Sequence, residues 1–330
     1  MKLLITGGAG FIGSAFVRFL AKRHSEDDLY VLDKLTYAGN LENLNSVPAY
    51  TFIHGDICDE SLVKSTLADY KIEAIIHFAA ESHVDRSING ADVFVKTNVV
   101  GTQTLLNAAK EHGIHKFIQV STDEVYGSLG TSGYFTELSP LAPNSPYSAS
   151  KAGLDLLARA YHETYGLDVN ITRCSNNYGP YHFPEKLIPL MITNALQNKT
   201  LPVYGDGLHV RDWLHVDDHC KAINLVLRKG KPGEVYNIGG QNERTNIEIV
   251  ERIVQTLGVS KSLIQFVGDR LGHDRRYAID ASKIESELGW KADYAFEEGI
   301  VEVIDWYIQE KEWWQRVLSG EYRRRAEEYS

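Results

Sequence analysis

The chain has 330 residues, of which 43% are hydrophobic, so it is able to bury a large core in one or two closely joined domains. Its formal net charge of −10 argues against a nucleic-acid-binding protein, and we expect the one basic cluster, Arg323-Arg324-Arg325, to be a solvated helix face. Three cysteines give no disulfide framework, and no apolar run reaches the length of a signal peptide core or a membrane span, so we expect a cytoplasmic protein with no membrane partner.

Short apolar runs alternate with segments of helical periodicity in the first half of the chain. The runs are rich in β-branched residues and lie at 3–6, 30–32, 51–53, 74–78, 117–120 and 169–172. Segments with helical periodicity, at 11–23, 60–70, 92–112 and 147–165, separate most of them. This alternation is typical of βαβ units and predicts an α/β fold with a doubly wound parallel sheet of the Rossmann type.

The pattern becomes less regular after residue 174. Proline-containing loops separate short predicted strands at 203–204 and 235–238 from predicted helices at 186–198, 216–228 and 245–257. We therefore predict a Rossmann domain over 1–174, which carries the cofactor and the catalytic residues. A smaller α/β domain over 175–330 would mainly bind the substrate, with an approximate boundary across which the chain is free to return.

A glycine-rich turn follows the first predicted strand, with the sequence Thr6-Gly7-Gly8-Ala9-Gly10-Phe11-Ile12-Gly13. Glycines let the backbone turn tightly and approach a pyrophosphate, whose charge then lies at the N-terminus of the next helix. Asp33 ends the second strand, and an acid there holds the adenosine ribose hydroxyls and repels a 2′-phosphate. We therefore predict NAD rather than NADP, although the neighbouring Lys34 is the one feature that favours NADP.

Tyr147 and Lys151 lie four residues apart in a predicted helix and therefore on one face of it. A lysine ammonium close to a phenol favours the phenolate, which makes tyrosine a base near neutral pH. The Tyr-x-x-x-Lys spacing is frequent on helices and is weak evidence alone. Together with the glycine turn and with Ser121 and Thr122 after the fifth strand, the chain resembles the extended branch of the short-chain dehydrogenase/reductase family over nearly its whole length.

Within this branch, Ser121-Thr122-Asp123-Glu124-Val125-Tyr126-Gly127 resembles the catalytic signature of the dTDP-glucose 4,6-dehydratases. Epimerases and decarboxylases of the branch lack the adjacent acid pair. The stretches 33–41, 183–190, 210–214 and 269–277 also match this subfamily. Two departures, Leu271 in place of proline and His215-Val216-Asp217 in place of Tyr-Val-Glu, concern loop shape and sugar-nucleotide preference.

The resemblance implies a lyase that converts dTDP-glucose to dTDP-4-keto-6-deoxyglucose and water with bound NAD. It implies that Tyr147, helped by Thr122 and Lys151, takes the proton of the 4-hydroxyl while hydride leaves C4. Glu124 then removes the C5 proton, Asp123 protonates the departing C6 hydroxyl, and hydride returns to C6. An acid and a base formed by neighbouring carboxyl groups need surroundings of different polarity. Adjacent side chains on an extended segment point in different directions, so Asp123 and Glu124 would reach C6 and C5 separately.

The remaining predicted site residues line the cofactor or the nucleotide sugar. Asp56 and Ile57 are placed at the adenine, the Phe78-Ala79-Ala80 backbone against the cofactor, and Asn177 near the nicotinamide amide. The full cofactor set is Gly7, Gly10, Phe11, Ile12, Gly13, Asp33, Lys34, Thr36, Asp56, Ile57, Phe78, Ala79, Ala80, Ser82, Thr97, Tyr147, Lys151 and Asn177. The substrate set is Ser82, Thr122, Asn176, Lys186, Leu187, Pro202, Tyr204, Arg211, Asn246, Arg270 and His273.

Several alternatives remain open. A UDP-glucose 4,6-dehydratase would share every catalytic residue, an epimerase is disfavoured by the acid pair, and a non-catalytic NAD-binding scaffold needs none of the five catalytic residues. Cys174 is interpreted as structural, and no histidine spacing indicates a catalytic metal. We also predict a homodimer, because the helices at 92–112 and 147–165 carry surplus apolar residues and family members pair through them.

Overall fold

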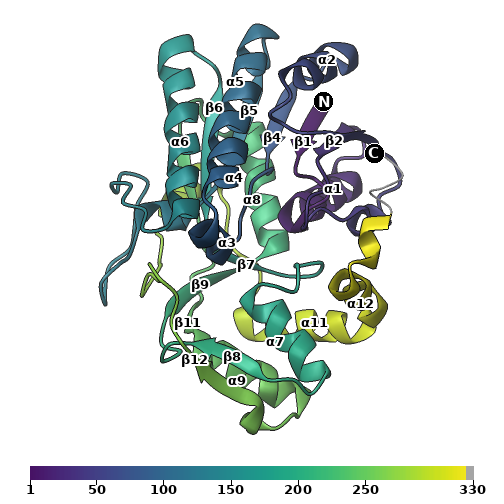
Figure 1. The fold of residues 1–330 in the computed structure, drawn as a ribbon. Helices are drawn as coiled ribbons and strands as arrows, with labels where there is room; N and C mark the ends of the chain where they lie inside the picture. Colours follow the sequence, from purple (N-terminus) through teal and green to yellow (C-terminus); the bar gives the residue numbers. More distant parts are fainter. Residues whose placement is uncertain (325–330) are drawn as a thin grey trace.

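The computed structural model describes residues 1–324 and is built around a seven-stranded parallel sheet with the strand order β10-β6-β5-β4-β1-β2-β3 (Figure 1). Helices cover both faces of this sheet, so the predicted doubly wound Rossmann fold is confirmed. The strands are β1 (Lys2–Thr6), β2 (Asp28–Asp33), β3 (Thr51–His54), β4 (Ala74–His77), β5 (Lys116–Thr122), β6 (Val169–Cys174) and β10 (Val235–Ile238). The helices around it are α1 (Phe11–Arg23), α2 (Glu60–Tyr70), α3 (Val84–Asn89), α4 (Asp92–Phe94), α5 (Thr102–Glu111), α6 (Pro146–Tyr165), α8 (Val216–Lys229) and α10 (Ser282–Leu288).

Strand β1 shows how the apolar runs produce two cores. Successive side chains of a strand point to opposite faces of the sheet. Leu3 and Ile5 enter a core shared with α1, α8 and α10, whereas Leu4 enters a second core shared with α2, α5 and α6. All three side chains are fully buried, so the run must be apolar at every position.

The segment predicted as one helix over 92–112 is interrupted. After α4 the chain forms a π-helical segment, η2 (Val95–Gly101), before α5 begins. The side chain of Asn98 in this segment accepts a hydrogen bond from the backbone N–H of Glu81 at 2.8 Å and donates to Ser150 Oγ at 2.8 Å. The widened turn thus joins the loop after β4 to α6, which carries Tyr147.

A second lobe packs around its own core below the sheet in Figure 1. It contains α7 (Leu187–Leu196), α9 (Asn246–Leu257), α11 (Phe296–Gln309) and α12 (Lys311–Ser319), a three-stranded sheet in the order β11 (Glu243–Thr245), β9 (Val210–His215), β7 (Asn176–Tyr178), and a two-stranded sheet of β8 (Leu201–Tyr204) and β12 (Ile264–Val267). Short 3-10 turns are η1 (Leu41–Leu44), η3 (Asp123–Tyr126), η4 (Lys261–Leu263) and η5 (Glu321–Arg323).

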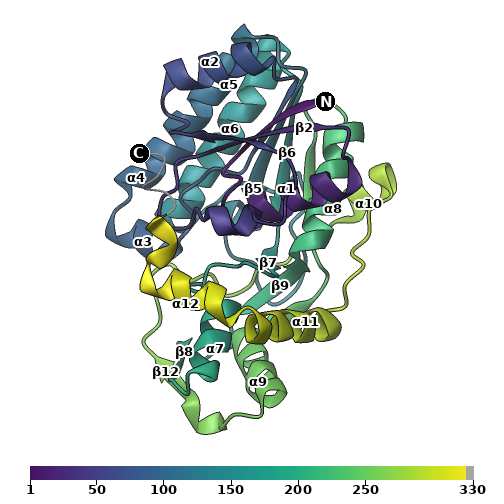
Figure 2. The same cartoon turned by 90° about the vertical axis from the view of Figure 1, so that its right-hand side faces the viewer.

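The two lobes are joined by more than one crossing of the chain. β10 pairs with β6 as the last strand of the large sheet, although its residues belong to the later half of the sequence. The end of the chain also returns to the first lobe, where Trp313 Nε1 donates to Asn43 Oδ1 at 3.1 Å and Arg316 pairs with Glu42 at 3.0 Å (Figure 2). Arg325, part of the basic cluster, lies outside the described residues. No helix of the described residues is long and apolar enough to cross a membrane.

Candidate active site

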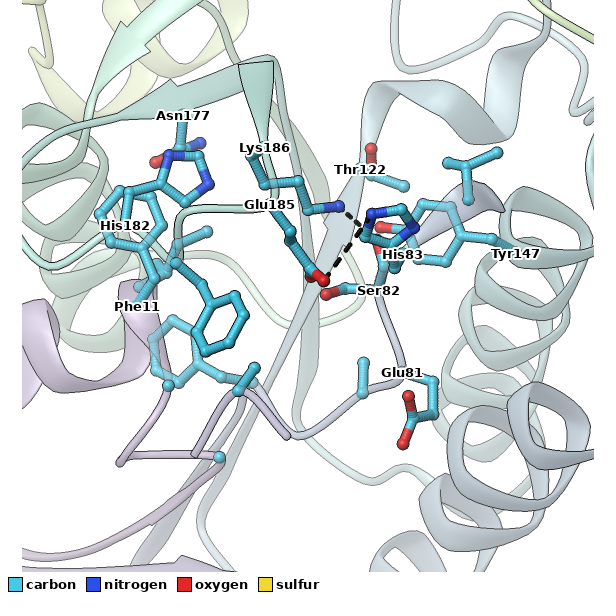
Figure 3. Close-up of a pocket in the computed structure, with 18 of the residues that line it drawn as sticks. Phe11, Glu81, Ser82, His83, Thr122, Tyr147, Asn177, His182, Glu185 and Lys186 are labelled. Carbon is cyan, nitrogen blue, oxygen red and sulfur yellow. Dashed lines mark hydrogen bonds and ion pairs between the residues drawn. The ribbon is translucent and has the colours of Figure 1, made fainter. Parts of the chain in front are cut away.

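One cavity of about 520 Å³ lies between the lobes, at the carboxyl ends of the parallel strands. This is where ligands bind in open α/β sheets, because the loops after the strands meet there. Every residue predicted to hold the cofactor or the substrate, and each of the five predicted catalytic residues, lines this cavity. Figure 3 shows Thr122 and Tyr147 on one side of it and Phe11 and His182 on the other.

The glycine turn closes tightly against the sheet. Gly7 has a φ of +69°, and a Cβ on Gly13 would lie 2.2 Å from the Gly7 carbonyl oxygen, so neither position tolerates a side chain. Gly10 precedes α1 and supplies no side-chain cap to the first amides of that helix. The uncapped amides and the helix dipole therefore fit the pyrophosphate of a dinucleotide at this wall of the cavity.

Asp33 lies beside this turn, where Oδ2 accepts from the Ala9 N–H at 2.9 Å and Oδ1 from the Leu35 N–H at 2.8 Å. Burial raises the pKa of Asp33, and the two backbone hydrogen bonds oppose that rise. Lys34 pairs with Asp56 at 2.7 Å, so its ammonium already has an anionic partner. The residue that favoured NADP in the sequence is thus engaged by a carboxylate.

The acid pair begins the 3-10 turn η3 immediately after β5. The Thr122 hydroxyl caps this turn, since it accepts from the Glu124 N–H at 3.3 Å, and it donates to Asp123 Oδ1 at 3.3 Å. The expectation that the pair lies on an extended segment is wrong, because Gly127 and this cap favour a turn. The turn, rather than strand alternation, sets the directions of the two side chains.

Asp123 and Glu124 experience different electrostatic surroundings. Burial raises the pKa of Asp123 well above its usual range, and the charges of Glu124 and Asp212 raise it further. Burial also raises the pKa of Glu124, but Arg270, Lys186 and Arg211 oppose that rise. Asp123 Oδ2 has no hydrogen-bond partner within the described residues. Within the pair, the surroundings thus favour the proton on Asp123 over the proton on Glu124.

Tyr147 is the second residue of α6 and lies inside the capping box formed by Ser145 and Ser148. Burial raises the pKa of Tyr147 well above its ordinary value, and the charge of Glu124 raises it further. The hydrogen bond with the Thr122 hydroxyl lowers it. The Lys151 ammonium donates to the Val120 carbonyl at 2.7 Å, and burial lowers its pKa. The expected lowering of the Tyr147 pKa by Lys151 is therefore not found, because the ammonium is held by β5 and the phenol is buried.

Cationic groups line the second-lobe end of the cavity. Arg211 on β9 is 4% exposed, donates to the Asp274 carbonyl at 2.8 Å and stacks over the Tyr277 ring at 4.3 Å. Arg270 lies 3.8 Å from Asp85, and its Nε has no partner within the described residues. Such fixed and partly unpaired guanidinium groups suit phosphate oxygens.

A family model described as GDP-mannose 4,6 dehydratase matches residues 4–303. The chain is 54% identical to the dTDP-glucose 4,6-dehydratase of Neisseria meningitidis serogroup B, covering 98% of this chain and 97% of that one, and 51% identical to the dTDP-glucose 4,6-dehydratase of Escherichia coli, covering 98% of each. The chain belongs to the dTDP-glucose 4,6-dehydratase family.

Solved structures agree with this membership. The crystal structure of the dTDP-glucose 4,6-dehydratase DesIV from Streptomyces venezuelae with NAD bound has a TM-score of 0.93 and 56% identity, covering 96% of this chain and all of that one. A UDP-glucose 4-epimerase from Thermotoga maritima has a TM-score of 0.88 but only 29% identity, covering 94% of this chain and 99% of that one. The fold is thus shared with epimerases, whereas the sequence is closer to the dehydratases.

Some cavity residues of this dehydratase-family chain were not predicted from the sequence. His182 stacks on Phe11 with ring centroids 4.1 Å apart, and Glu185 approaches Arg86 at 3.4 Å. Glu185 carried a signal, since it directly precedes Lys186 in a stretch that matches the subfamily. His182 carried none. The two departures from the subfamily, Leu271 and His215, lie outside the residues that line the cavity.

The prediction that this chain has no catalytic metal stays a prediction. Within residues 1–324, His209, Asp269 and His273 form the group of possible ligands nearest the cavity. The two imidazole rings stack with centroids 3.6 Å apart and 15° between their planes. Their in-plane lone pairs therefore lie in two separate and nearly parallel planes, a poor arrangement for binding one ion. Burial raises the pKa of Cys174 to about 12, which fits a structural thiol.

Proposed function

We propose that this protein is a dTDP-glucose 4,6-dehydratase, which converts dTDP-glucose to dTDP-4-keto-6-deoxyglucose and water. The observation that carries the proposal is the acid pair. Asp123 and Glu124 lie in one cavity with Tyr147 and Lys151, and their surroundings favour one proton donor and one proton acceptor. An epimerase has no elimination step and needs no such pair.

Bound NAD supplies the acceptor for the hydride of C4 and the donor of the hydride that C6 receives. Tyr147 takes the proton of the sugar 4-hydroxyl, and the Thr122 hydroxyl, which lowers the pKa of that phenol, assists it. The resulting ketone acidifies the C5 hydrogen, which Glu124 removes. Asp123 donates its proton to the C6 hydroxyl, so the bond from C6 to oxygen breaks and water leaves. When C6 receives the hydride, Glu124 returns its proton to C5, which completes the 6-deoxy product.

The substrate role of the second lobe rests on charge and position. Arg211, Arg270 and Lys186 line the cavity beyond the acid pair and suit the two phosphates. Asn176 and Asn246 each keep a buried side-chain oxygen without a partner in the described residues, which is available to a ligand donor. Pro202, Tyr204, Leu187 and His273 complete this wall.

The activity is tested by incubating purified protein with dTDP-glucose or UDP-glucose and following the mass of the sugar nucleotide. We expect loss of one water from dTDP-glucose. Faster loss from UDP-glucose would favour the alternative nucleotide, and a product of unchanged mass with inverted C4 would favour an epimerase. Binding of NAD with no conversion of either sugar would favour a non-catalytic scaffold.

We expect NADP to replace NAD poorly. The Asp33 carboxylate repels a 2′-phosphate, and Lys34 is already paired with Asp56. Activity of protein freed of cofactor and then supplied with either dinucleotide measures this preference. Changing Asp33 to Asn removes the repulsion and is expected to narrow the difference. Equal activity of the unaltered protein with both dinucleotides would contradict the assignment of Asp33.

We expect a homodimer formed through η2, α5 and α6. Helices α5 and α6 lie side by side in both views (Figures 1 and 2), and η2 leads directly into α5. Val95 is 51% exposed, Val100 44% and Leu156 58%, which is an unusual apolar content for a solvated helix face. Light scattering at micromolar concentration measures the mass. Changing Leu156 to Glu is expected to give monomers, whereas a monomeric unaltered protein would contradict the proposal.

We also propose a cytoplasmic location. Cys58, Cys174 and Cys220 are all free thiols, as a reducing compartment allows.

A further inference from the structure

Residues 180–186, which we call the cover segment, connect β7 of the second lobe to α7 and border the cavity. Four of its side chains, His182, Phe183, Glu185 and Lys186, line the cavity, whereas Tyr181 packs against Trp306 and Trp313 of the second lobe. Figure 3 shows Glu185 and Lys186 between the wall that carries Phe11 and the wall that carries Tyr147. The cover segment thus lies across the ligand site.

The first half of the cover segment closes on the glycine turn. The His182 ring stacks on Phe11, the first residue of α1, with centroids 4.1 Å apart and planes 11° apart. Burial lowers the pKa of His182 to about 3, so this ring is neutral and behaves as an aromatic surface. Phe183 meets the edge of Tyr37, which follows β2, at 5.8 Å. These ring contacts join the cover segment to both loops that flank the proposed dinucleotide site.

The second half of the cover segment binds the first lobe through charged side chains. The Glu185 carboxylate lies 3.4 Å from Arg86 at the start of α3, and the Arg86 guanidinium stacks on the Tyr37 ring at 3.7 Å. His83 lies 3.7 Å from the same carboxylate, but burial lowers its pKa to about 4, so at neutral pH the attraction comes from Arg86. Lys186 adds a hydrogen bond to the Ser82 carbonyl at 2.8 Å.

We infer that Arg86 and Glu185 are positioning residues that hold the cover segment closed over NAD between turnovers. The inference rests on the proposed function, in which the same cofactor gives back the hydride that it receives and need not leave. Glu185 is 16% exposed and Arg86 50% exposed at the side chain, so the pair is accessible enough to open. Neither Arg86 nor the Tyr37 ring on which it stacks is among the residues that line the cavity, which separates this role from proton transfer.

The test measures release of radiolabelled NAD from the holoenzyme into excess unlabelled NAD, without any sugar nucleotide. We expect Glu185→Gln and Arg86→Gln each to speed release about fivefold, as for a partly exposed ion pair, and the double variant to add little more. The matched control is Glu297→Gln, which breaks the Arg244–Glu297 pair of the second lobe at 2.5 Å, away from the cavity. This control is expected to release NAD at the unaltered rate.

A second measurement distinguishes closure from chemistry. If Glu185 holds the cover segment, added NAD at saturating concentration restores the turnover of Glu185→Gln with dTDP-glucose. If Glu185 instead transfers a proton, this variant keeps its NAD release rate and loses turnover at any NAD concentration, which overturns the inference. Unaltered release in both variants also overturns it. Because release is read without substrate, failure of the dehydratase assignment would leave this result interpretable.

Discussion

Changing Tyr147 to Phe is expected to lower the rate of C4 oxidation by roughly 10²-fold to 10⁴-fold, the usual contribution of a positioned acid or base. The change removes one oxygen from a side chain that is 8% exposed, and the hydrogen-bond partner of that oxygen is the side chain of Thr122. The fold is therefore expected to persist. Rapid-mixing absorbance of the reduced nicotinamide after addition of dTDP-glucose measures the step.

The matched control is Tyr161→Phe on the same helix. The Tyr161 hydroxyl donates to Asn107 Oδ1 at 2.6 Å and lies outside the cavity, so its loss should leave oxidation unaltered. If Tyr147→Phe reduced the cofactor as fast as the unaltered protein, the base for the 4-hydroxyl would have to be another group. The desolvated phenol would then be a packing residue of α6.

The glycine turn and the strand ends were predictable because local rules decide them. Gly13 has no room for a Cβ, and Asp33 ends a strand beside that turn, so spacing alone indicates a dinucleotide site. The acid pair was also predictable as a motif, since it follows the buried strand β5. Its electrostatic asymmetry depends on Arg211 and Asp212 from β9, about 90 residues later, and no local pattern reveals it.

Other features depend on contacts between distant segments. The sequence places the short strand β10 in the predicted second domain. In the structure it pairs with β6, because that edge of the large sheet offers unpaired backbone groups. The π-helical turn at Asn98 fits hydrogen bonds to Glu81 and Ser150, which the helical periodicity of 92–112 does not encode. The cover segment is an irregular loop whose role follows only from what faces it.

The raised pKa of Tyr147 marks a limit of motif reasoning. The Tyr-x-x-x-Lys spacing places both side chains on one face of α6, but it does not determine what the ammonium contacts. In the structure the Lys151 ammonium donates a hydrogen bond to the Val120 carbonyl of β5. Activation of the phenol must therefore come from the assembled complex rather than from this pair alone.

Changing Asp123 to Asn or Glu124 to Gln is expected to slow the loss of water by about 10²-fold or more while C4 oxidation persists. Each change keeps the size of the side chain and removes, respectively, the proton donor for the C6 hydroxyl and the base for C5. The reduced nicotinamide should therefore form and accumulate. Mass analysis of quenched samples shows whether the sugar keeps its oxygen.

The control is Asp168→Asn, which is expected to lose water at the unaltered rate. Asp168 directly precedes β6, and its carboxylate pairs with Lys116 at 2.8 Å, outside the cavity.

The pH dependence of dehydration assigns the two roles. Asp123 must be protonated, so the rate falls as pH rises through its strongly raised pKa, and Glu124 must be ionised, so the rate falls as pH drops through its own raised pKa. The two limbs belong to a coupled pair, and the optimum lies between them. Asp123→Asn should remove the alkaline limb and Glu124→Gln the acidic limb from the residual rate. If either variant lost water at the unaltered rate, the acid pair would be no more than polar residues at the end of a strand, and the dehydratase proposal would lose its main support.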